Sequence, residues 1–189
     1  ATKRWTEEGF ARTVRHFAAA HTVVLIGGKE DRGLCERIVA RSGVEAVNAA
    51  GMLSLPGSAA MIGGAQVLIS NDSAPVHMAS AMDTPVVEIF GATVPEFGFT
   101  PFGVPHRVVQ REGLDCKPCG IHGGTNCPIK TFACMTELPA PEIIAAAEKA
   151  VAGDRRPLSK ALSGPRPQWL RYLEVSRNPF GHPARLPPT

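Results

Sequence analysis

The sequence predicts an α/β fold built on a doubly wound parallel sheet of the Rossmann-like type. Apolar runs of strand length alternate with helix-like segments, and the connections between them are short. The run 22–26 is β-branched and apolar on both faces, as expected of a central parallel strand. In such a sheet the crossovers are right-handed and ligands bind at the carboxyl ends of the strands.

The first half of the chain supplies three helices and two strands in this order. A helix is expected to begin after Thr6, whose hydroxyl can cap it, because Phe10, Val14 and Phe17 recur on one face. A strand at 22–26 should follow at once. The remaining expected elements are a helix from Asp31 to Ser42-Gly43, a weaker strand at 46–48 and a short helix at 56–63.

The second half continues the alternation of strands and helices as far as Gly91, after which the composition changes. Strands are expected at 67–69 and 86–90, with a helix at 75–81 between them. Prolines and glycines after Gly91 predict a long loop before a short strand at 107–109. The last expected helix of this region begins at Pro141.

The chain divides by composition into a folded domain over residues 1–152 and a tail over 153–189. The domain contains a cysteine-rich loop at 113–136, and the tail is rich in proline and arginine. A short amphipathic helix is expected in the tail near 167–176. This helix would need a surface on which to dock.

Composition and charge exclude several classes of protein. Hydrophobic residues make up 44% of the chain and charged residues 20%, with no apolar run long enough to span a bilayer. The net charge of +3 is small, and the basic residues are scattered until the tail, so no nucleic-acid partner is expected. The chain opens without a signal or lipidation motif, which favours a cytoplasmic location with at most peripheral membrane contact.

The segment 71–77 is the strongest candidate site. It joins the strand at 67–69 to a helix that carries Pro75 in its first turn, where a missing amide costs nothing. The free amides and partial positive charge of a helix start favour an anion such as a diphosphate, which the Ser73 hydroxyl and His77 can also reach. The alternative is that Asp72 or Ser73 only caps the helix and His77 packs against it.

Several motifs together resemble glycosyltransferase family 9, the family of the ADP-heptose:lipopolysaccharide heptosyltransferases. In order, the segments that carry the resemblance are Lys3-Arg4-Trp5, 27–31, 71–81, 84–87, 91–93 and Cys116-Lys117-Pro118-Cys119. No single one is diagnostic, but their order and spacing cover roughly 150 residues. The resemblance is to the C-terminal, donor-binding half of a two-domain GT-B enzyme.

The resemblance implies inverting transfer of a heptose from ADP-heptose, or a related nucleotide sugar, to the inner core of lipopolysaccharide. The acceptor would be held by an N-terminal domain, and the catalytic base would be an Asp of that domain. No residue of this chain is therefore assigned as the base. The implied location is the cytoplasm, at the cytoplasmic face of the inner membrane.

By the same resemblance, the turn at 71–77 holds the diphosphate of the donor. A helix start and a lysine can together stabilise the departing diphosphate, so no catalytic metal is expected. One departure is notable: Ala74 stands where the family commonly has Gly, which would approach an anion more closely. The residues implied in donor binding are Lys3, Asp72, the amides of Ser73, Ala74 and Val76, His77 and, as a weaker candidate, Thr93.

The nucleoside of the donor has its own candidates. Asp31 follows Gly27-Gly28 at the end of a strand and can accept hydrogen bonds from ribose hydroxyls, or it can simply be a helix N-cap. Met52 and Leu53, with Leu55, can form an apolar slot for the base, or they can belong to the core.

Four cysteines lie within 19 residues, at Cys116, Cys119, Cys127 and Cys134. In a reducing cytosol this cluster suggests a structural zinc or iron site more than disulfides, although the spacing is not that of a standard zinc ribbon. Packed free thiols are the alternative. Four cysteine ligands would leave no open position for catalysis.

The sequence offers two alternatives to the transferase. The chain can be a non-catalytic nucleotide-binding or interaction module of the same family, which keeps the nucleotide site but lacks the base. An NAD-binding domain is disfavoured because no G-x-G-x-x-G pattern follows the first strand.

Overall fold

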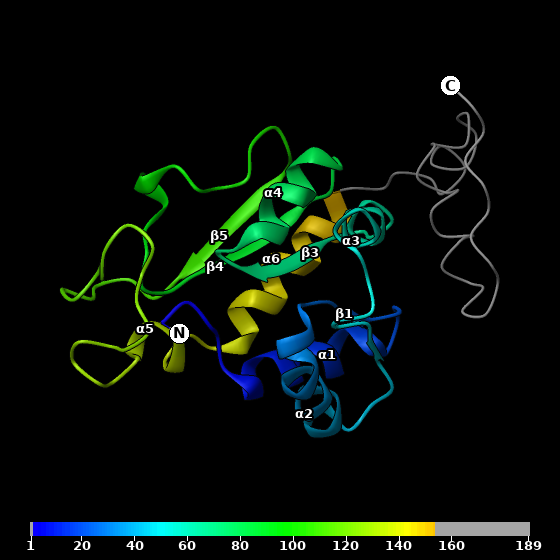
Figure 1. Ribbon diagram of the computed structural model, residues 1–189, viewed down its shortest axis with the longest axis horizontal. Helices are drawn as coiled ribbons and strands as arrows, with labels where there is room; N and C mark the ends of the chain where they lie inside the picture. Colours follow the sequence, from blue (N-terminus) through cyan, green and yellow to red (C-terminus); the bar gives the residue numbers. More distant parts are fainter. Residues whose placement is uncertain (1, 154–189) are drawn as a thin grey trace. The chain divides into compact units, whose positions relative to one another are not determined.

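The computed structural model describes residues 2–153 of the chain (Figure 1). Its elements alternate between strands and helices, with all strand pairs parallel. In chain order they are α1 (Glu7–Ala18), β1 (Val24–Leu25), η1 (Lys29–Asp31), α2 (Arg32–Ser42), β2 (Val47–Asn48), α3 (Leu55–Gly63), β3 (Leu68–Asn71), α4 (Ala74–Ala81), β4 (Val86–Phe90), η2 (Pro95–Phe97), β5 (His106–Gln110), α5 (Ala133–Thr136) and α6 (Ala140–Gly153).

The strands form two hydrogen-bonded sheets. One contains β1 and β2, and the other has the order β3-β4-β5. In the larger sheet Ser70 of β3 lies opposite Glu88 of β4, which in turn lies opposite Val108 of β5. The predicted fold class is therefore confirmed, but the smaller sheet is short, since the strand expected at 22–26 is reduced to two residues.

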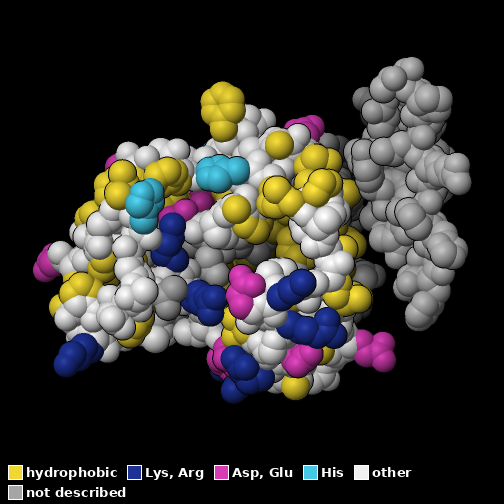
Figure 2. Space-filling view, viewed as in Figure 1, with side chains coloured by type: hydrophobic (Ala, Val, Ile, Leu, Met, Phe, Trp, Pro, Cys, Tyr) yellow, Lys and Arg dark blue, Asp and Glu magenta, His cyan; other side chains and the backbone are white. Residues whose placement is uncertain are grey.

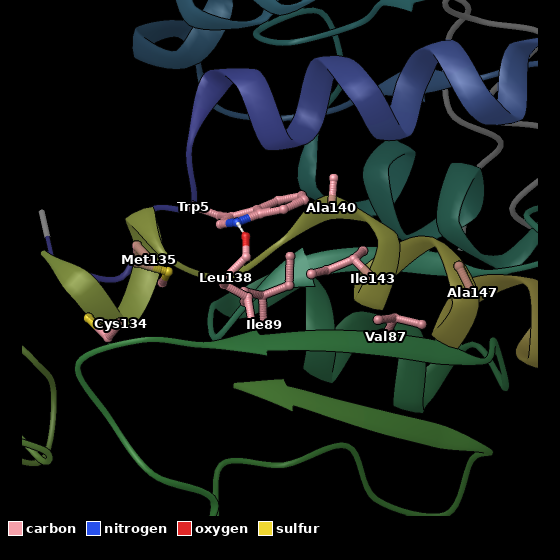
Figure 3. Close-up of a cluster of buried hydrophobic side chains, with 9 residues drawn as sticks. All are labelled: Trp5, Val87, Ile89, Cys134, Met135, Leu138, Ala140, Ile143 and Ala147. Carbon is pink, nitrogen blue, oxygen red and sulfur yellow. Dashed lines mark hydrogen bonds between the residues drawn. The ribbon is translucent and has the colours of Figure 1, made fainter. Parts of the chain in front are cut away.

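Helices cover both faces of the larger sheet. Helix α6 contacts β4 and β5, while α4 contacts β3 and β4. Alternation along β4 divides its side chains between two cores: Val87 and Ile89 pack with Trp5 and residues of α6, and Val86 packs with residues of α3 and α4. Figure 3 shows the first core, in which the Trp5 ring and α6 meet Val87 and Ile89.

Local signals explain several helix ends. The Thr6 side chain accepts a hydrogen bond from the amide of Gly9, as predicted for the cap of α1. Ser54 caps α3 in the same way by accepting from Gly57. Helix α2 stops at Gly43, which has the left-handed φ of 69° that glycine tolerates at this position.

Within residues 2–153 no helix is long and apolar enough to cross a membrane. The predicted tail over 153–189 and its helix near 167–176 lie outside the described residues, apart from Gly153 at the end of α6. The domain boundary after residue 152 stays a prediction.

Candidate functional site

Two neighbouring basic residues join the two turns that the sequence singled out. The Lys3 ammonium lies 2.7 Å from Oδ2 of Asp72, in the turn after β3. The Arg4 guanidinium lies 3.1 Å from Oδ1 of Asp31, in the turn after β1. The segment 2–5 thus runs between the carboxyl ends of the two sheets, and it brings the predicted residues Lys3, Asp31 and Asp72 into one region.

This segment is fixed by hydrogen bonds at both ends. Thr2 donates from its amide and its hydroxyl to the carbonyl of Gly124, at 2.9 and 2.8 Å. The Trp5 amide donates to Oδ1 of Asn71, and its buried indole donates to the carbonyl of Leu138 (Figure 3). Lys3 therefore lies between two anchored residues, which positions its ammonium beside Asp72. This role of Asn71 was not predicted from the sequence.

Asp72 is buried, with only 6% of its side chain exposed. Its Oδ2 accepts a second hydrogen bond, at 2.6 Å, from the hydroxyl of the fully buried Thr93. Thr93 thus helps to fix the Asp72 carboxylate, and its predicted direct contact with a ligand stays a prediction. Asp72 uses its carboxylate to fix Lys3 rather than to cap α4.

The start of α4 presents exposed residues beside this ion pair. Ser73 and Ala74 are exposed, and a helix leaves its first amides without intrahelical partners. The Ser73 hydroxyl donates to the carbonyl of Asn71, so it does not cap α4, and Ala74 avoids a positive φ. The exposed His77 belongs to the same helix. A cation and a helix start at one sheet edge can bind an anion.

The Val76 amide has a partner within the turn, and its predicted role in holding the diphosphate stays a prediction. This amide donates to the carbonyl of Ser73 at 3.0 Å, and Val76 is completely buried in the core beneath α4. Since Pro75 has no amide hydrogen and the Val76 amide bonds within the turn, the amides of Ser73 and Ala74 are the remaining donors of the first turn. In this structure Ser73 and Ala74 are the accessible positions of the turn.

Asp31 closes the turn after β1. Its Oδ2 accepts from the amide of Gly28 at 3.1 Å, while the side chain makes no capping bond to α2. The carboxylate is 27% exposed and also holds Arg4. The simple capping of α2 considered for Asp31 is therefore not observed, and the ribose role stays a prediction.

The proposed slot for the base lies next to this turn. The Gly51 amide donates to the carbonyl of Gly27, and a side chain at Gly51 would collide with the backbone of Lys29. This close approach fixes the following loop, in which Met52 is 66% exposed and Leu53 is half-buried. The exposure of Met52 is not that of a core residue. Figure 2 shows a face of the molecule on which apolar, basic and acidic side chains surround a hollow.

Glu88 is a feature of the site that the sequence analysis missed. It lies in the middle of β4, is completely buried, and neither carboxyl oxygen has a hydrogen-bond partner within the described residues. Burial and, to a smaller extent, the Asp72 carboxylate raise the pKa of Glu88, Lys3 partly offsets both, and the net pKa is about 8. The available signal was a charged residue in an otherwise apolar strand.

All four cysteines of the loop are free thiols. Burial raises the pKa of Cys134 and of Cys119, and backbone amide donors, chiefly that of Phe132, lower the pKa of Cys127. Within residues 2–153 no group of three or more Cys, His, Asp or Glu side chains is arranged to hold a metal ion. The structure thus does not present Cys116, Cys119, Cys127 and Cys134 as a formed metal site, and the zinc or iron hypothesis stays a prediction.

Comparison with known proteins gives consistent matches. The model of glycosyltransferase family 9 (heptosyltransferase) matches residues 1–126. Lipooligosaccharide heptosyltransferase 2 of Campylobacter jejuni is 27% identical over 149 residues, which is 76% of this chain and 45% of the relative. Lipopolysaccharide heptosyltransferase 3 of Escherichia coli is 36% identical over 95 residues, or 48% of this chain and 28% of the relative.

Solved structures show the same fold. A glycosyl transferase family 9 protein from Veillonella parvula superposes with a TM-score of 0.67 at 23% identity, over 81% of this chain and 43% of that one. The ADP-heptose lps heptosyltransferase II of E. coli gives a TM-score of 0.65 at 19% identity, over 80% and 43% of the two chains. The chain spans about half the length of the curated relatives first matched.

Proposed function

The chain belongs to glycosyltransferase family 9, and on that premise we propose that it binds the nucleotide-sugar donor of an inverting heptosyltransferase. The proposed donor is ADP-heptose and the proposed acceptor is a sugar of the lipopolysaccharide inner core. The names of the relatives, which are lipooligosaccharide and lipopolysaccharide heptosyltransferases, support this choice. The proposed location is the cytoplasm, where the donor domain meets an N-terminal acceptor domain.

One observation carries the proposal: a lysine is fixed on a buried aspartate beside the start of a helix, at the carboxyl ends of parallel strands. Lys3 is 2.7 Å from Asp72, and the exposed residues Ser73 and Ala74 open α4 next to it. Such an edge is the usual ligand site of an open α/β sheet. A diphosphate placed here would meet the Lys3 ammonium, which is paired with Asp72, and the partial positive charge of the helix start.

This arrangement suits the departure of a nucleoside diphosphate. As the bond to the sugar breaks, negative charge builds on the diphosphate, and fixed positive groups around it lower the barrier. Lys3 needs little rearrangement, because Thr2 and Trp5 on either side of it are anchored. We propose that these groups stabilise the leaving group without a catalytic metal ion.

The activation of the acceptor is assigned outside this donor site. The carboxylates at the site already have structural tasks: Asp72 fixes Lys3 and accepts a hydrogen bond from Thr93, and Asp31 holds Arg4 and the turn after β1. We propose that the catalytic base belongs to the acceptor domain, as the resemblance implies.

Calorimetric titration with ADP, UDP and NAD tests the donor assignment. We expect ADP to bind and NAD to bind at least about tenfold more weakly, because the site holds a terminal diphosphate. Variants Asp72→Ala and His77→Ala should each weaken ADP binding while the domain stays folded by circular dichroism. UDP or NAD binding in the absence of ADP binding would overturn the donor assignment.

A transfer assay separates the enzyme from the non-catalytic module. The full-length gene product is incubated with ADP-heptose and a lipopolysaccharide core acceptor, and released ADP is measured. Acceptor-dependent release of ADP is expected. ADP binding without any release would favour the binding module.

A further inference from the structure

A buried acid lies within the sheet beneath the proposed donor site. Glu88 occupies the centre of β4, with none of its side chain exposed. Along β4 its neighbours Val87 and Ile89 pack toward α6, so alternation turns Glu88 to the face covered by α4. Across the sheet it pairs with Ser70, the strand residue two positions before Asp72.

The carboxyl group of Glu88 has no partner that would stabilise its negative charge directly. Both of its oxygens are buried without a hydrogen bond among residues 2–153. Transfer of a bare carboxylate into such a site is so unfavourable that the group keeps its proton instead. The raised pKa of Glu88, about 8, agrees with a neutral acid at neutral pH.

Few charged groups lie on the elements that surround this acid. Asp72 and Lys3 are the two that act on its pKa, in opposite directions. The other titratable groups on α4 and β5 are His77, His106 and Arg107, and all three are exposed. Strand β3, which is described in full, contains no titratable residue. On α6, which covers the opposite face, Glu142, Glu148 and Lys149 are exposed.

The charge of the site therefore depends on one proton. With Glu88 neutral, Lys3 and Asp72 cancel, and the helix start leaves the site attractive to an anion. With Glu88 ionised, one ammonium faces two carboxylates, and the site gains a negative charge close to the place where the donor diphosphate is proposed to lie.

We propose that Glu88 is a positioning residue of the donor site: as the neutral acid it leaves Lys3 to Asp72 and to the donor diphosphate, whereas as the carboxylate it competes for Lys3. This role rests on the proposed function, because it places the diphosphate at the Lys3–Asp72 pair. It predicts that the donor binds together with the proton on Glu88.

Titration of ADP binding against pH tests this role. Between about pH 7 and pH 9.5 the wild-type affinity should fall on the order of tenfold, since one added charge acts across a partly buried site. The midpoint should lie near the pKa of Glu88, about 8. ADP itself changes little in this range because phosphate groups lose their second proton near about pH 6.

The variant Glu88→Gln keeps the shape of the side chain but cannot ionise. Its ADP affinity should lose the step near pH 8, whereas His77→Asn and the exposed control Glu45→Gln should retain it. An unchanged step in Glu88→Gln would overturn the role of Glu88 while leaving the donor site intact. Absence of ADP binding at every pH would overturn the donor site and this role together.

Thermal unfolding of the unliganded protein gives an independent readout. In the unfolded chain Glu88 has its ordinary pKa of 4.5, whereas in the folded protein its pKa is about 8. Between these two pH values only the folded protein holds the proton, so the free energy of unfolding should fall as pH rises from about 4.5 to about 8. Glu88→Gln should lack this fall. The variant should therefore gain stability over wild type across this range, and a constant difference would overturn the proton assignment.

Discussion

The two ion pairs of the site differ in their surroundings although their basic partners are adjacent in sequence. Lys3 is 25% exposed and Asp72 6%, with 2.7 Å between their charged atoms. Arg4 is 57% exposed and Asp31 27%, with 3.1 Å between theirs. One pair lies at the edge of the larger sheet and the other at the edge of the smaller one.

This difference assigns different tasks to the two pairs. A solvent-exposed ion pair contributes little stability, so either of its residues can exchange its partner for a ligand at small cost. A mostly buried pair is costly to separate, so it keeps its geometry. We therefore expect the Lys3 side to hold the diphosphate rigidly and the Asp31 side to adapt to the nucleoside.

The largest effect is expected when Lys3 is replaced by methionine, and the matching replacement of Arg4 is the comparison. Lys3→Met leaves Asp72 buried without its cation and should cost about 2 kcal/mol in the free energy of unfolding. Arg4→Met breaks the exposed pair with Asp31 and should lower the free energy of unfolding by less than about 1 kcal/mol. Denaturant unfolding of both variants measures the contrast.

The same two variants differ in ligand binding. Lys3→Met should weaken ADP binding at least about tenfold, because it removes the charge proposed to meet the diphosphate. Arg4→Met should weaken it less. Equal losses of stability and affinity in both variants would contradict the distinction between a rigid and an adaptable side.

The next effect, of about fivefold, is expected at Asp31. Asp31→Asn keeps the shape of the turn but loses the charge that strengthens hydrogen bonds from ribose hydroxyls. ADP should bind more weakly, whereas inorganic pyrophosphate, which has no ribose, should bind as before. Calorimetry with both ligands measures this, and Glu30→Gln on the same turn is the control. A matching loss for pyrophosphate would place Asp31 at the diphosphate instead.

The contrast also shows which features the sequence could predict. Thr6 as the cap of α1, Gly43 at the end of α2 and the strand 86–90 depend on neighbouring residues, and each is found as predicted. The edge location of Asp72 was also predictable, because topology brings the carboxyl ends of strands together. That of Lys3 came from the resemblance to the family.

Hydrogen bonds between residues far apart in the chain could not be predicted from the sequence. The bond from Arg4 to Asp31 spans 27 residues, and that from Thr93 to Asp72 spans 21. Neither follows from local pattern, so Asp31 was open between a cap and a ligand, and Thr93 was placed among the ligands. Glu88 was overlooked because its burial depends on helices packed on both faces of β4.

A smaller effect, of about threefold, is expected at Met52. Its side chain is 66% exposed beside the turn after β1, so Met52→Ala should leave stability within about 0.5 kcal/mol of wild type. Loss of apolar contact with the base should weaken ADP binding but not pyrophosphate binding. Unchanged ADP affinity would remove Met52 from the base slot.

The smallest effect is expected from metal removal. EDTA should change ADP affinity by less than about twofold, because we assign the positive charge at the diphosphate to Lys3 and to the start of α4. A large loss of ADP affinity would indicate that a metal cation helps to bind the diphosphate on the Lys3 side of the site. Elemental analysis of the same protein tests the cysteines separately. Zinc and iron together below about a tenth of an equivalent would favour free thiols, whereas a stoichiometric metal that EDTA removes without loss of ADP binding would be structural.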